Sequence, residues 1–361
     1  MGTRVAFVLP SYDLGGAQRV LLTLLENIDK SAIDPILIVF DGQGPLANLV
    51  PDWVPVFDLG RPRLRQILPS LLRTLRKLTP DVIFSTFGYV NISLLAMRPF
   101  LQGRPRIIVR EPNTPSQSIP SLRYSHLLRV SYRILYPRAE TIICQSNLMI
   151  EEFVRDFGIP PERLKYLSNP VDINHLRDSI GQYKRDPGPG HRFAAVGSLT
   201  WQKGFDRLLD MMVDMPEDTQ LEIFGEGSER AVLERRRTDL GLDGRVHMPG
   251  ETDNPWSACA GADALLLPSR WEGMPNVALE ALACGLPVIG TPTAGGITDV
   301  AALCIEGAVS LAEPGHEFIG AMRNVAIRSS KSLGKSLLPK NFHVERVAIE
   351  FNKILRQETL L

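Results

Sequence analysis

The sequence predicts an α/β protein built from two Rossmann-like, doubly wound domains in tandem. Short apolar runs alternate with amphipathic helical stretches in the first half, a polar link rich in glycine and proline follows, and a second alternating series then begins. Strands that alternate with helices favour a parallel sheet. A chain of 361 residues with 44% hydrophobic residues can supply a core for each domain.

The first series predicts buried strands and one clear helix. The Gly15-Gly16 turn separates the first strand from an amphipathic helix at 17–28, and the series ends around Ser168–Asp172. The expected strands are 5–10, 35–42, 81–87, 106–112 and 140–146. Residues 1–172 are therefore predicted to form the first domain.

The second series follows the link at 181–192, GQYKRDPGPGHR. It predicts strands at 192–199, 221–227, 245–250, 262–269 and 286–290, and helices at 204–212, 228–240 and 276–284. The second domain is predicted to span 173–343, with the amphipathic helix at about 344–361 packing back on the first domain. We expect the domains to face each other across a cleft, with ligands at the carboxyl ends of the strands.

Cysteine spacing and apolar run lengths exclude several classes. The four cysteines are far apart, which predicts reduced thiols in an intracellular protein and no zinc site. The N-terminal apolar run is too short for a signal peptide, and no run of about 18 apolar residues could span a membrane. The histidines lack ligand spacing and no D-x-D occurs, so we expect neither a metal nor a cofactor.

Two glutamates eight residues apart, Glu272 and Glu280, stand in the apolar stretch RWEGMPNVALEALACGLPVIG. Pro275 and Asn276 suit the first turn of a helix, whose free N–H groups form an anion site suited to phosphate. Glu280, one turn inside the helix, could accept hydrogen bonds from a ribose, and Glu272 could hold a sugar. The alternative is an ordinary helix with acidic residues favoured by its dipole.

The stretch EGMPNVALEALACGLPVI resembles the E-x7-E signature of the retaining, nucleotide-sugar-dependent glycosyltransferases of GT-B fold, family 4. GGAQRV (15–20), SNPVD (168–172), VGSLTWQKGFDRLL (196–209) and FGEGSER (224–230) are similar to other family motifs, in order. The resemblance covers nearly the whole chain. It implies transfer of a sugar from a nucleotide-sugar, with retained anomeric configuration, to a glycan or lipid-linked acceptor in cell-surface polysaccharide or glycolipid synthesis.

The resemblance also implies that residues 1–172 form the acceptor-side domain and residues 173–343 the nucleotide-sugar donor domain, and it implies site residues. Lys203 would neutralise the leaving diphosphate, Glu272 would orient the sugar hydroxyls, and the backbone at His247-Met248-Pro249 would contact the base. Taken singly, each glycine could be a plain turn and Lys203 a solvated lysine. The implied donor-binding residues are Gly15, Gly16, Gly197, Ser198, Lys203, Gly225, Met248, Gly273, Met274, Pro275, Asn276 and Glu280.

Two positions depart from the family pattern. Ser198 stands where the family usually has an arginine, so neutralisation of the diphosphate must rely on Lys203, the helix start, and a further cation such as Arg19 or Arg270. The first-domain loop RIIVREPNTPS lacks the histidine that many members carry. Arg110 and Glu111 occupy that loop as candidate catalytic residues, or they form a local ion pair.

Charge is unevenly distributed along a chain of zero net charge. Residues 61–138 contain 14 basic and 2 acidic residues. The segments 61–78 and 119–138 mix arginines with apolar residues, which suits an anionic membrane surface. We therefore expect a cytoplasmic protein that binds peripherally to the inner face of the cytoplasmic membrane. The alternative is two ordinary helices with a solvated basic face.

Other classes fit less well. A dehydrogenase would need a G-x-G-x-x-G turn that the first domain lacks, and a nucleic-acid binder would need a module that is absent. A catalytically inactive, nucleotide-binding scaffold of the same fold remains an alternative because of Ser198. We expect UDP as the nucleotide and a hexosyl or N-acetylhexosaminyl transfer. The sequence does not name the sugar, acceptor, linkage or oligomeric state.

Overall fold

The computed structural model describes residues 2–60, 64–121, 125–180, 190–252, 254–328 and 334–358. The chain forms two compact units: unit 1 is Met1–Pro170 with Val344–Leu361, and unit 2 is Val171–His343. The division therefore lies two residues before the predicted boundary at 172/173. Residues 181–189 of the predicted link lie outside the described residues.

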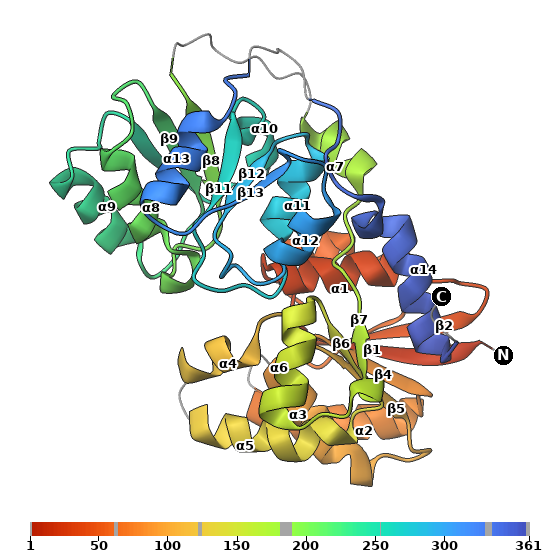
Figure 1. The fold of residues 1–361 in the computed structure, drawn as a ribbon. Helices are drawn as coiled ribbons and strands as arrows, with labels where there is room; N and C mark the ends of the chain where they lie inside the picture. The colour runs from red at the N-terminus through yellow and green to blue at the C-terminus, as the bar shows by residue number, and fades with distance from the viewer. Residues whose placement is uncertain are drawn as a thin grey trace. The chain divides into compact units, whose positions relative to one another are not determined.

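Unit 1 has a parallel sheet of seven strands in the order β3-β2-β1-β4-β5-β6-β7 (Figure 1). The strands are β1 (Thr3–Ser11), β2 (Ile33–Asp41), β3 (Val56–Asp58), β4 (Val82–Ser85), β5 (Arg106–Arg110), β6 (Thr141–Cys144) and β7 (Leu164–Tyr166). The helices are α1 (Gly16–Glu26), α2 (Leu64–Leu78), α3 (Gly88–Met97), α4 (Pro115–Ser118), α5 (Ser125–Leu135), α6 (Asn147–Phe157) and α14 (Val344–Arg356), with short 3-10 turns η1 (Pro45–Leu49), η2 (Arg98–Phe100), η3 (Ile119–Ser121), η4 (Tyr136–Arg138) and η5 (Pro161–Arg163).

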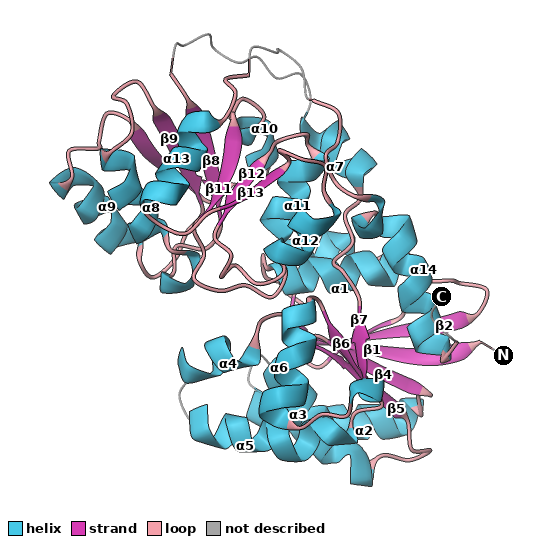
Figure 2. Ribbon diagram, viewed as in Figure 1, coloured by secondary structure: helices cyan, strands magenta, loops and turns pink. Residues whose placement is uncertain are grey.

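Helices cover both faces of this sheet because alternate strand residues point to opposite sides. Ala6 and Val8 lie in one core cluster with residues of α2, α3, α5 and α6. Val5 and Phe7 lie in the other with residues of α1 and α14, including Phe351. The C-terminal helix α14 thus packs on unit 1, as Figure 2 shows.

Unit 2 has a parallel sheet of six strands in the order β10-β9-β8-β11-β12-β13. The strands are β8 (Arg192–Val196), β9 (Gln220–Phe224), β10 (Val246–Gly250), β11 (Ala264–Leu267), β12 (Val288–Gly290) and β13 (Val309–Leu311). The helices are α7 (Ile173–Ile180), α8 (Phe205–Val213), α9 (Arg230–Asp239), α10 (Pro255–Cys259), α11 (Asn276–Ala283), α12 (Ile297–Leu303) and α13 (His316–Asn324), with 3-10 turns η6 (Trp201–Lys203) and η7 (Lys340–Phe342).

The order of this sheet reverses between β8 and β11. Phe193 and Ala195 of β8 pack with α8, α9 and α13, whereas Ala194 packs with α10, α11 and α12. The connections that leave β8 and β11 therefore run to opposite faces of the sheet. Such a switch point opens a crevice at the carboxyl ends of the two strands, which is where ligands bind in doubly wound sheets.

The predicted α/β class, the parallel sheets and each predicted strand are confirmed. The three-residue strands β3, β7 and β13 were not predicted. Within the described ranges, every helix is too short or too polar to cross a membrane.

Candidate functional site

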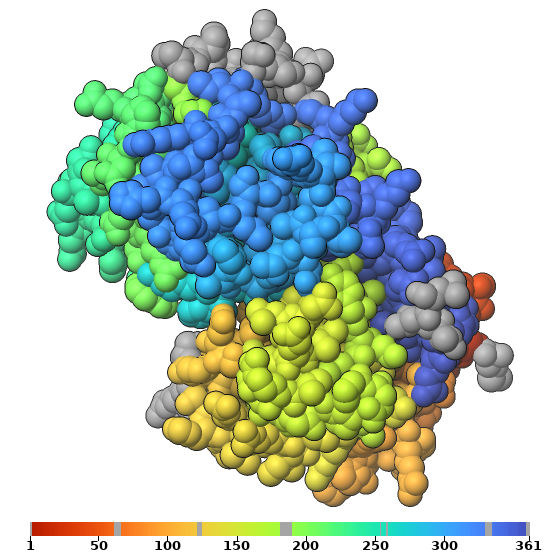
Figure 3. Space-filling model, viewed as in Figure 1, coloured from red at the N-terminus to blue at the C-terminus, as the bar shows by residue number. Residues whose placement is uncertain are grey.

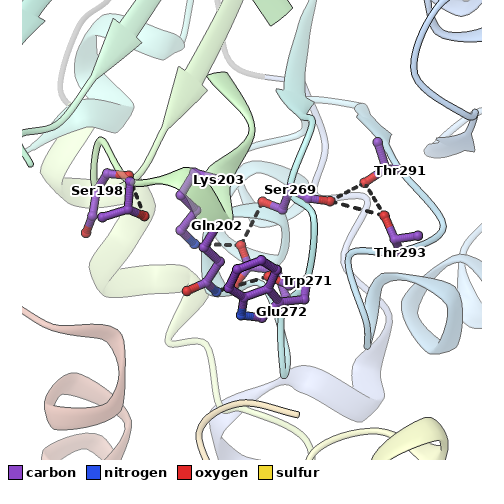
Figure 4. A network of polar contacts seen from close by, with 9 residues as sticks. Ser198, Gln202, Lys203, Ser269, Trp271, Glu272, Thr291 and Thr293 are labelled. Atoms are coloured by element: carbon purple, nitrogen blue, oxygen red, sulfur yellow. Dashed lines mark hydrogen bonds and ion pairs between the residues drawn. The ribbon is translucent and has the colours of Figure 1, made fainter. Parts of the chain in front are cut away.

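Lys203 and Glu272 meet at the carboxyl ends of the neighbouring strands β8 and β11. Lys203 ends the turn η6 after β8, and Glu272 lies in the loop between β11 and α11. The Lys203 ammonium nitrogen is 2.6 Å from Glu272 Oε1, although 69 residues separate the two in the chain. The pair is thus built by the topological switch point (Figure 4).

Glu272 is held by three side chains. Its Oε1 also accepts a hydrogen bond of 2.8 Å from Ser269 Oγ, and its Oε2 accepts one of 3.3 Å from Gln202 Nε2. Only 5% of Glu272 is exposed. Burying a carboxylate costs several kcal/mol unless a cation and hydrogen bonds compensate. Both kinds of partner are present, so the carboxylate is fixed in one position.

The loop between β12 and α12 is hydrogen-bonded to the loop that carries Glu272. Thr291 Oγ1 donates a 2.6 Å hydrogen bond to Ser269 O, and Gly296 N donates one of 2.8 Å to Gly273 O. A Cβ atom at Gly295 would lie 2.1 Å from the Glu272 carbonyl oxygen. Sequence reasoning missed this support, whose signal is the Gly-Gly pair shortly after β12.

The helix α11 starts at Asn276, with Pro275 as its N-cap residue rather than in its first turn. The amides of Ala278 and Leu279 donate to the Pro275 carbonyl at 3.0 and 3.3 Å. The first amides of a helix have no intrahelical acceptor and attract anions. Gly273, Met274 and Pro275 are buried, so this helix start is a preorganised backbone surface next to Glu272.

Glu280 lies one turn inside α11 from Asn276, and its Oε2 accepts a 3.1 Å hydrogen bond from Trp256 Nε1. Trp256 is buried on α10 and was not predicted as a site residue. The indole fixes one oxygen of the carboxylate. The second glutamate of the signature is therefore oriented, as the first one is.

The predicted glycines near β8 and β9 serve close backbone packing. A Cβ atom at Gly225 would lie 2.0 Å from the Gly197 carbonyl oxygen, and one at Gly227 would lie 2.4 Å from Leu199 O. Ser198 is exposed between these loops and lies apart from Glu272 in Figure 4. The Met248 carbonyl on β10 already accepts a hydrogen bond of 3.3 Å from Arg230.

Arg270, a candidate further cation for the diphosphate, already has a carboxylate partner, as Lys203 does. Its guanidinium binds Asp206 at 2.7 and 2.6 Å and lies 3.2 Å from the centre of the Trp201 ring. Its charge is already neutralised by a carboxylate. In unit 1, Gly15 is the N-cap of α1, and Gly16 and Arg19 are exposed on its first turns.

Arg110 and Glu111 are both buried at the carboxyl end of β5. Consecutive strand residues point to opposite faces, and no ion pair joins these two among the described residues. Arg110 donates to Thr86 Oγ1 at 2.7 Å and to Asn169 Oδ1. Burial lowers the pKa of Arg110 to about 9, and the charge of Glu111 partly offsets this.

Glu111 lies in a cage of neutral groups and is 3% exposed. Its carboxylate accepts hydrogen bonds from Asn91 Nδ2 at 2.8 Å, from Tyr132 OH at 3.1 Å and from Tyr136 OH. Burial raises the pKa of Glu111 to about 7, against the lowering effect of these hydrogen bonds. Contact of Arg110 or Glu111 with a substrate would require their networks to open.

The two basic segments of unit 1 differ in what they bury. In α2, Ile67, Leu71 and Leu75 lie in the core, and exposed residues such as Arg76 and Lys77 face outward. This corrects the expectation for 61–78: its apolar face is not available to a membrane. Residues 61–63 lie outside the described part of the chain.

In α5, by contrast, apolar residues point outward. Leu127, Val130 and Ile134 are 67%, 50% and 56% exposed, and Arg129 beside them is exposed as well. The spacing of three and four residues places them on one stripe of the helix. Figure 3 shows α5 and α6, in yellow and yellow-green, forming much of the visible surface of unit 1.

The described residues contain no cluster of three His, Cys, Asp or Glu side chains arranged to hold a metal. Cys259 and Cys284 are buried free thiols, and burial raises the pKa of Cys284 to about 12.

Two family descriptions match adjoining parts of the chain: Glycosyltransferase Family 4 over residues 14–175 and Glycosyl transferases group 1 over residues 181–313. A relative from Campylobacter jejuni is 26% identical over 302 residues, 80% of each chain. It is an N-acetylgalactosamine-N,N'-diacetylbacillosaminyl-diphospho-undecaprenol 4-alpha-N-acetylgalactosaminyltransferase. A UDP-Gal:alpha-D-GlcNAc-diphosphoundecaprenol alpha-1,3-galactosyltransferase of Escherichia coli is 25% identical, over 76% of each chain.

Among solved structures, a protein of Anabaena in complex with UDP and glucose superposes with a TM-score of 0.77 at 20% identity. The superposition covers 98% of this chain and 100% of that one. The structural likeness therefore includes residues of both units.

Proposed function

The chain belongs to the glycosyltransferases of family 4, group 1, and on that premise we propose that it transfers a hexosyl or N-acetylhexosaminyl group from a UDP-sugar to a hydroxyl group, with retention. The acceptor is a glycan or a lipid-linked glycan in cell-surface polysaccharide or glycolipid synthesis. The observation that carries the proposal is the Lys203–Glu272 ion pair beside the start of α11. The donor and acceptor named for the Escherichia coli relative support it.

Each group of the site has a distinct role. The Lys203 ammonium has three N–H donors, and Glu272 Oε1 accepts from it at 2.6 Å. A bound diphosphate can accept from the remaining donors, so one lysine holds Glu272 and stabilises the departing negative charge. Glu272 orients the hydroxyls of the transferred sugar. The start of α11 binds the phosphates, and Glu280 accepts hydrogen bonds from the ribose.

Retention follows from attack on the same face of the sugar that the leaving group occupies. The bond from the anomeric carbon to the diphosphate oxygen breaks with its electron pair on the oxygen. That phosphate oxygen then takes the acceptor hydroxyl proton while the new bond forms. Lys203 and the helix start supply the electrostatic stabilisation without a metal ion. Arg110 and Glu111 are enclosed in unit 1. They act indirectly, by fixing the carboxyl end of β5.

The donor site is tested by isothermal titration calorimetry with UDP, GDP and ADP, each with and without a chelator. We expect binding of UDP in the micromolar range, no effect of the chelator, and loss of binding in Glu280→Ala. A protein that binds none of the three nucleotides would refute the donor site.

A catalytically inactive, nucleotide-binding scaffold is the second candidate, favoured by the exposed Ser198 in place of arginine. Incubation with UDP-sugars distinguishes the two. Slow release of UDP that Glu272→Gln abolishes supports the transferase. UDP binding without any release, with a crude lipid-linked acceptor fraction present, supports the scaffold.

We further propose that α5 binds unit 1 to the anionic inner face of the cytoplasmic membrane. Its exposed stripe of Leu127, Val130 and Ile134 lies beside Arg129, the pattern of an interfacial helix. Flotation with vesicles tests this. The wild type should float with vesicles that contain anionic lipid, Leu127→Glu should not, and the exposed Val232→Glu on α9 should behave as the wild type. Equal flotation of all three would refute the role of α5.

A further inference from the structure

Unit 2 contains a pocket of about 500 Å³ at the carboxyl edge of its sheet. It lies among α8 and the loops that follow β11, β12 and β13, and its lining includes Arg207, Arg270, Thr293 and Glu313. Its volume falls within the roughly 300–1,000 Å³ range of ligand pockets. None of the residues assigned to the nucleotide-sugar lines it.

The polar groups of the pocket include one available donor and one available acceptor. Asp210 is neutralised by Arg236 at 2.7 and 2.8 Å, and Arg270 by Asp206. In the described part of the chain, the Arg207 guanidinium and the Glu313 carboxylate have no hydrogen bond or ion pair. An arginine donates only and a carboxylate accepts only. A neutral polyhydroxyl ligand, whose hydroxyl groups both donate and accept, satisfies both at once.

The pocket adjoins the reaction site. Thr293 Oγ1 donates to Ser269 O at 3.3 Å, and Ser269 Oγ donates to Glu272. On the other side, Arg270 lies against the ring of Trp201, two residues before Lys203. Trp201 is 57% exposed, and Arg270 with its bound Asp206 holds the ring in place.

We propose that this pocket is a subsite for a neutral sugar residue of the acceptor glycan, an inference that rests on the proposed function. Arg207 donates to the hydroxyl oxygens of that sugar, and Glu313 accepts from its hydroxyl groups. The subsite adjoins Glu272 through Thr293 and Ser269.

Saturation-transfer NMR with glucose, galactose, N-acetylglucosamine and N-acetylgalactosamine tests the subsite, with and without saturating UDP. At least one sugar should bind the wild type in the millimolar range. Arg207→Ala should weaken that binding about tenfold, the effect of a lost hydrogen bond from a charged group. Glu313→Gln should weaken it less. Arg235→Ala, an exposed arginine on α9, is the matched control and should bind as the wild type does.

Calorimetry with UDP on the same four proteins separates the two proposals. If UDP fails to bind the wild type, the proposed function fails, whatever the sugars do. If UDP binds equally to all four while no sugar binds, or while Arg207→Ala retains sugar binding, the subsite is overturned. Weaker binding of the UDP-sugar but not of UDP by Arg207→Ala would assign the pocket to the donor sugar and overturn the acceptor assignment.

Discussion

Glu272 in unit 2 and Glu111 in unit 1 are both buried carboxylates close to the carboxyl end of a parallel strand, yet their surroundings differ in kind. Glu272 accepts from a lysine and a serine hydroxyl at 2.6 and 2.8 Å. Glu111 accepts from an amide and two tyrosine hydroxyls, and the cation whose charge acts on it, Arg110, binds Thr86 and Asn169 instead.

The difference separates a carboxylate whose cationic partner has further donors to offer from one enclosed by neutral groups. A lysine can share its donors between the carboxylate and an incoming diphosphate, so in the proposed site the pair can accept a ligand. Neutral hydroxyl groups compensate the burial of Glu111 only in part, and its pKa rises to about 7. Glu111 is therefore a group whose charge depends on pH, enclosed away from solvent. Four substitutions probe this contrast.

The largest expected effect is on Lys203. Lys203→Met leaves the Glu272 carboxylate buried without its cation, so the free energy of unfolding at neutral pH should fall by about 3–5 kcal/mol. Urea denaturation measures it. Lys77→Met, at an exposed position of α2, is the control and should change little. The double variant Lys203→Met/Glu272→Gln should regain most of the loss. An unchanged stability of Lys203→Met would mean that the ion pair does not compensate the burial of Glu272.

The next effect is on the reaction. Glu272→Gln keeps the shape of the side chain but removes its charge, so UDP-sugar turnover should fall about 10²–10³-fold, as when one preorganised electrostatic group is lost. Calorimetry should show a much smaller change in the affinity for UDP alone, because in the proposed site Lys203, the start of α11 and Glu280 still contact the nucleotide. A turnover near that of the wild type would place the sugar away from Glu272.

The sequence predicted the elements of these two sites better than their contacts. Long apolar runs specified β1, β8 and β11, whereas the three residues of β3 and of β13 are at most half-buried and carry too little apolar pattern to be recognised. Lys203 and Glu272 were each predicted, but their mutual contact depends on two strands that become neighbours only through the topology of the sheet.

Because a sequence pattern does not give tertiary contacts, the two basic helices were also predicted to behave alike. The segments 61–78 and 119–138 show the same mixture of arginine and leucine. The spacing of Ile67, Leu71 and Leu75 predicts one apolar face, but it does not tell whether that face meets a core or solvent. In α2 it meets the core, and in α5 part of the apolar surface remains outside. The cage of Glu111 was likewise beyond prediction, because Asn91 and Tyr132 come from helices distant in sequence.

Glu111→Gln should change how stability depends on pH. The folded-state pKa, about 7, lies above the ordinary 4.5, so the native state binds the extra proton. This favourable contribution is complete below about pH 4.5 and is lost as pH rises through 7, which corresponds to up to about 3 kcal/mol. The glutamine variant should lose that slope.

Thermal denaturation of Glu111→Gln at pH 5 and pH 8 measures the slope. The stability of the variant minus that of the wild type should be larger at pH 8 than at pH 5. Glu151→Gln, at an exposed position of α6, should keep the slope of the wild type. A parallel pH dependence in Glu111→Gln and the wild type would show that Glu111 is ionised throughout this range.

The smallest expected effect concerns Tyr132, one of the hydrogen-bond donors that enclose Glu111. Tyr132→Phe keeps the ring stacked on Tyr136, with centroids 4.2 Å apart, but removes the hydroxyl that donates to Glu111 at 3.1 Å. That hydrogen bond lowers the pKa of Glu111, so its loss raises the pKa further and destabilises mainly the ionised form. The variant should lose about 1 kcal/mol at pH 8 and less at pH 5. Urea denaturation at the two pH values measures this. In the Glu111→Gln background, the loss of stability caused by Tyr132→Phe should no longer depend on pH. If the loss is equal at both pH values in the wild-type background, Tyr132 acts through packing instead of through the charge of Glu111.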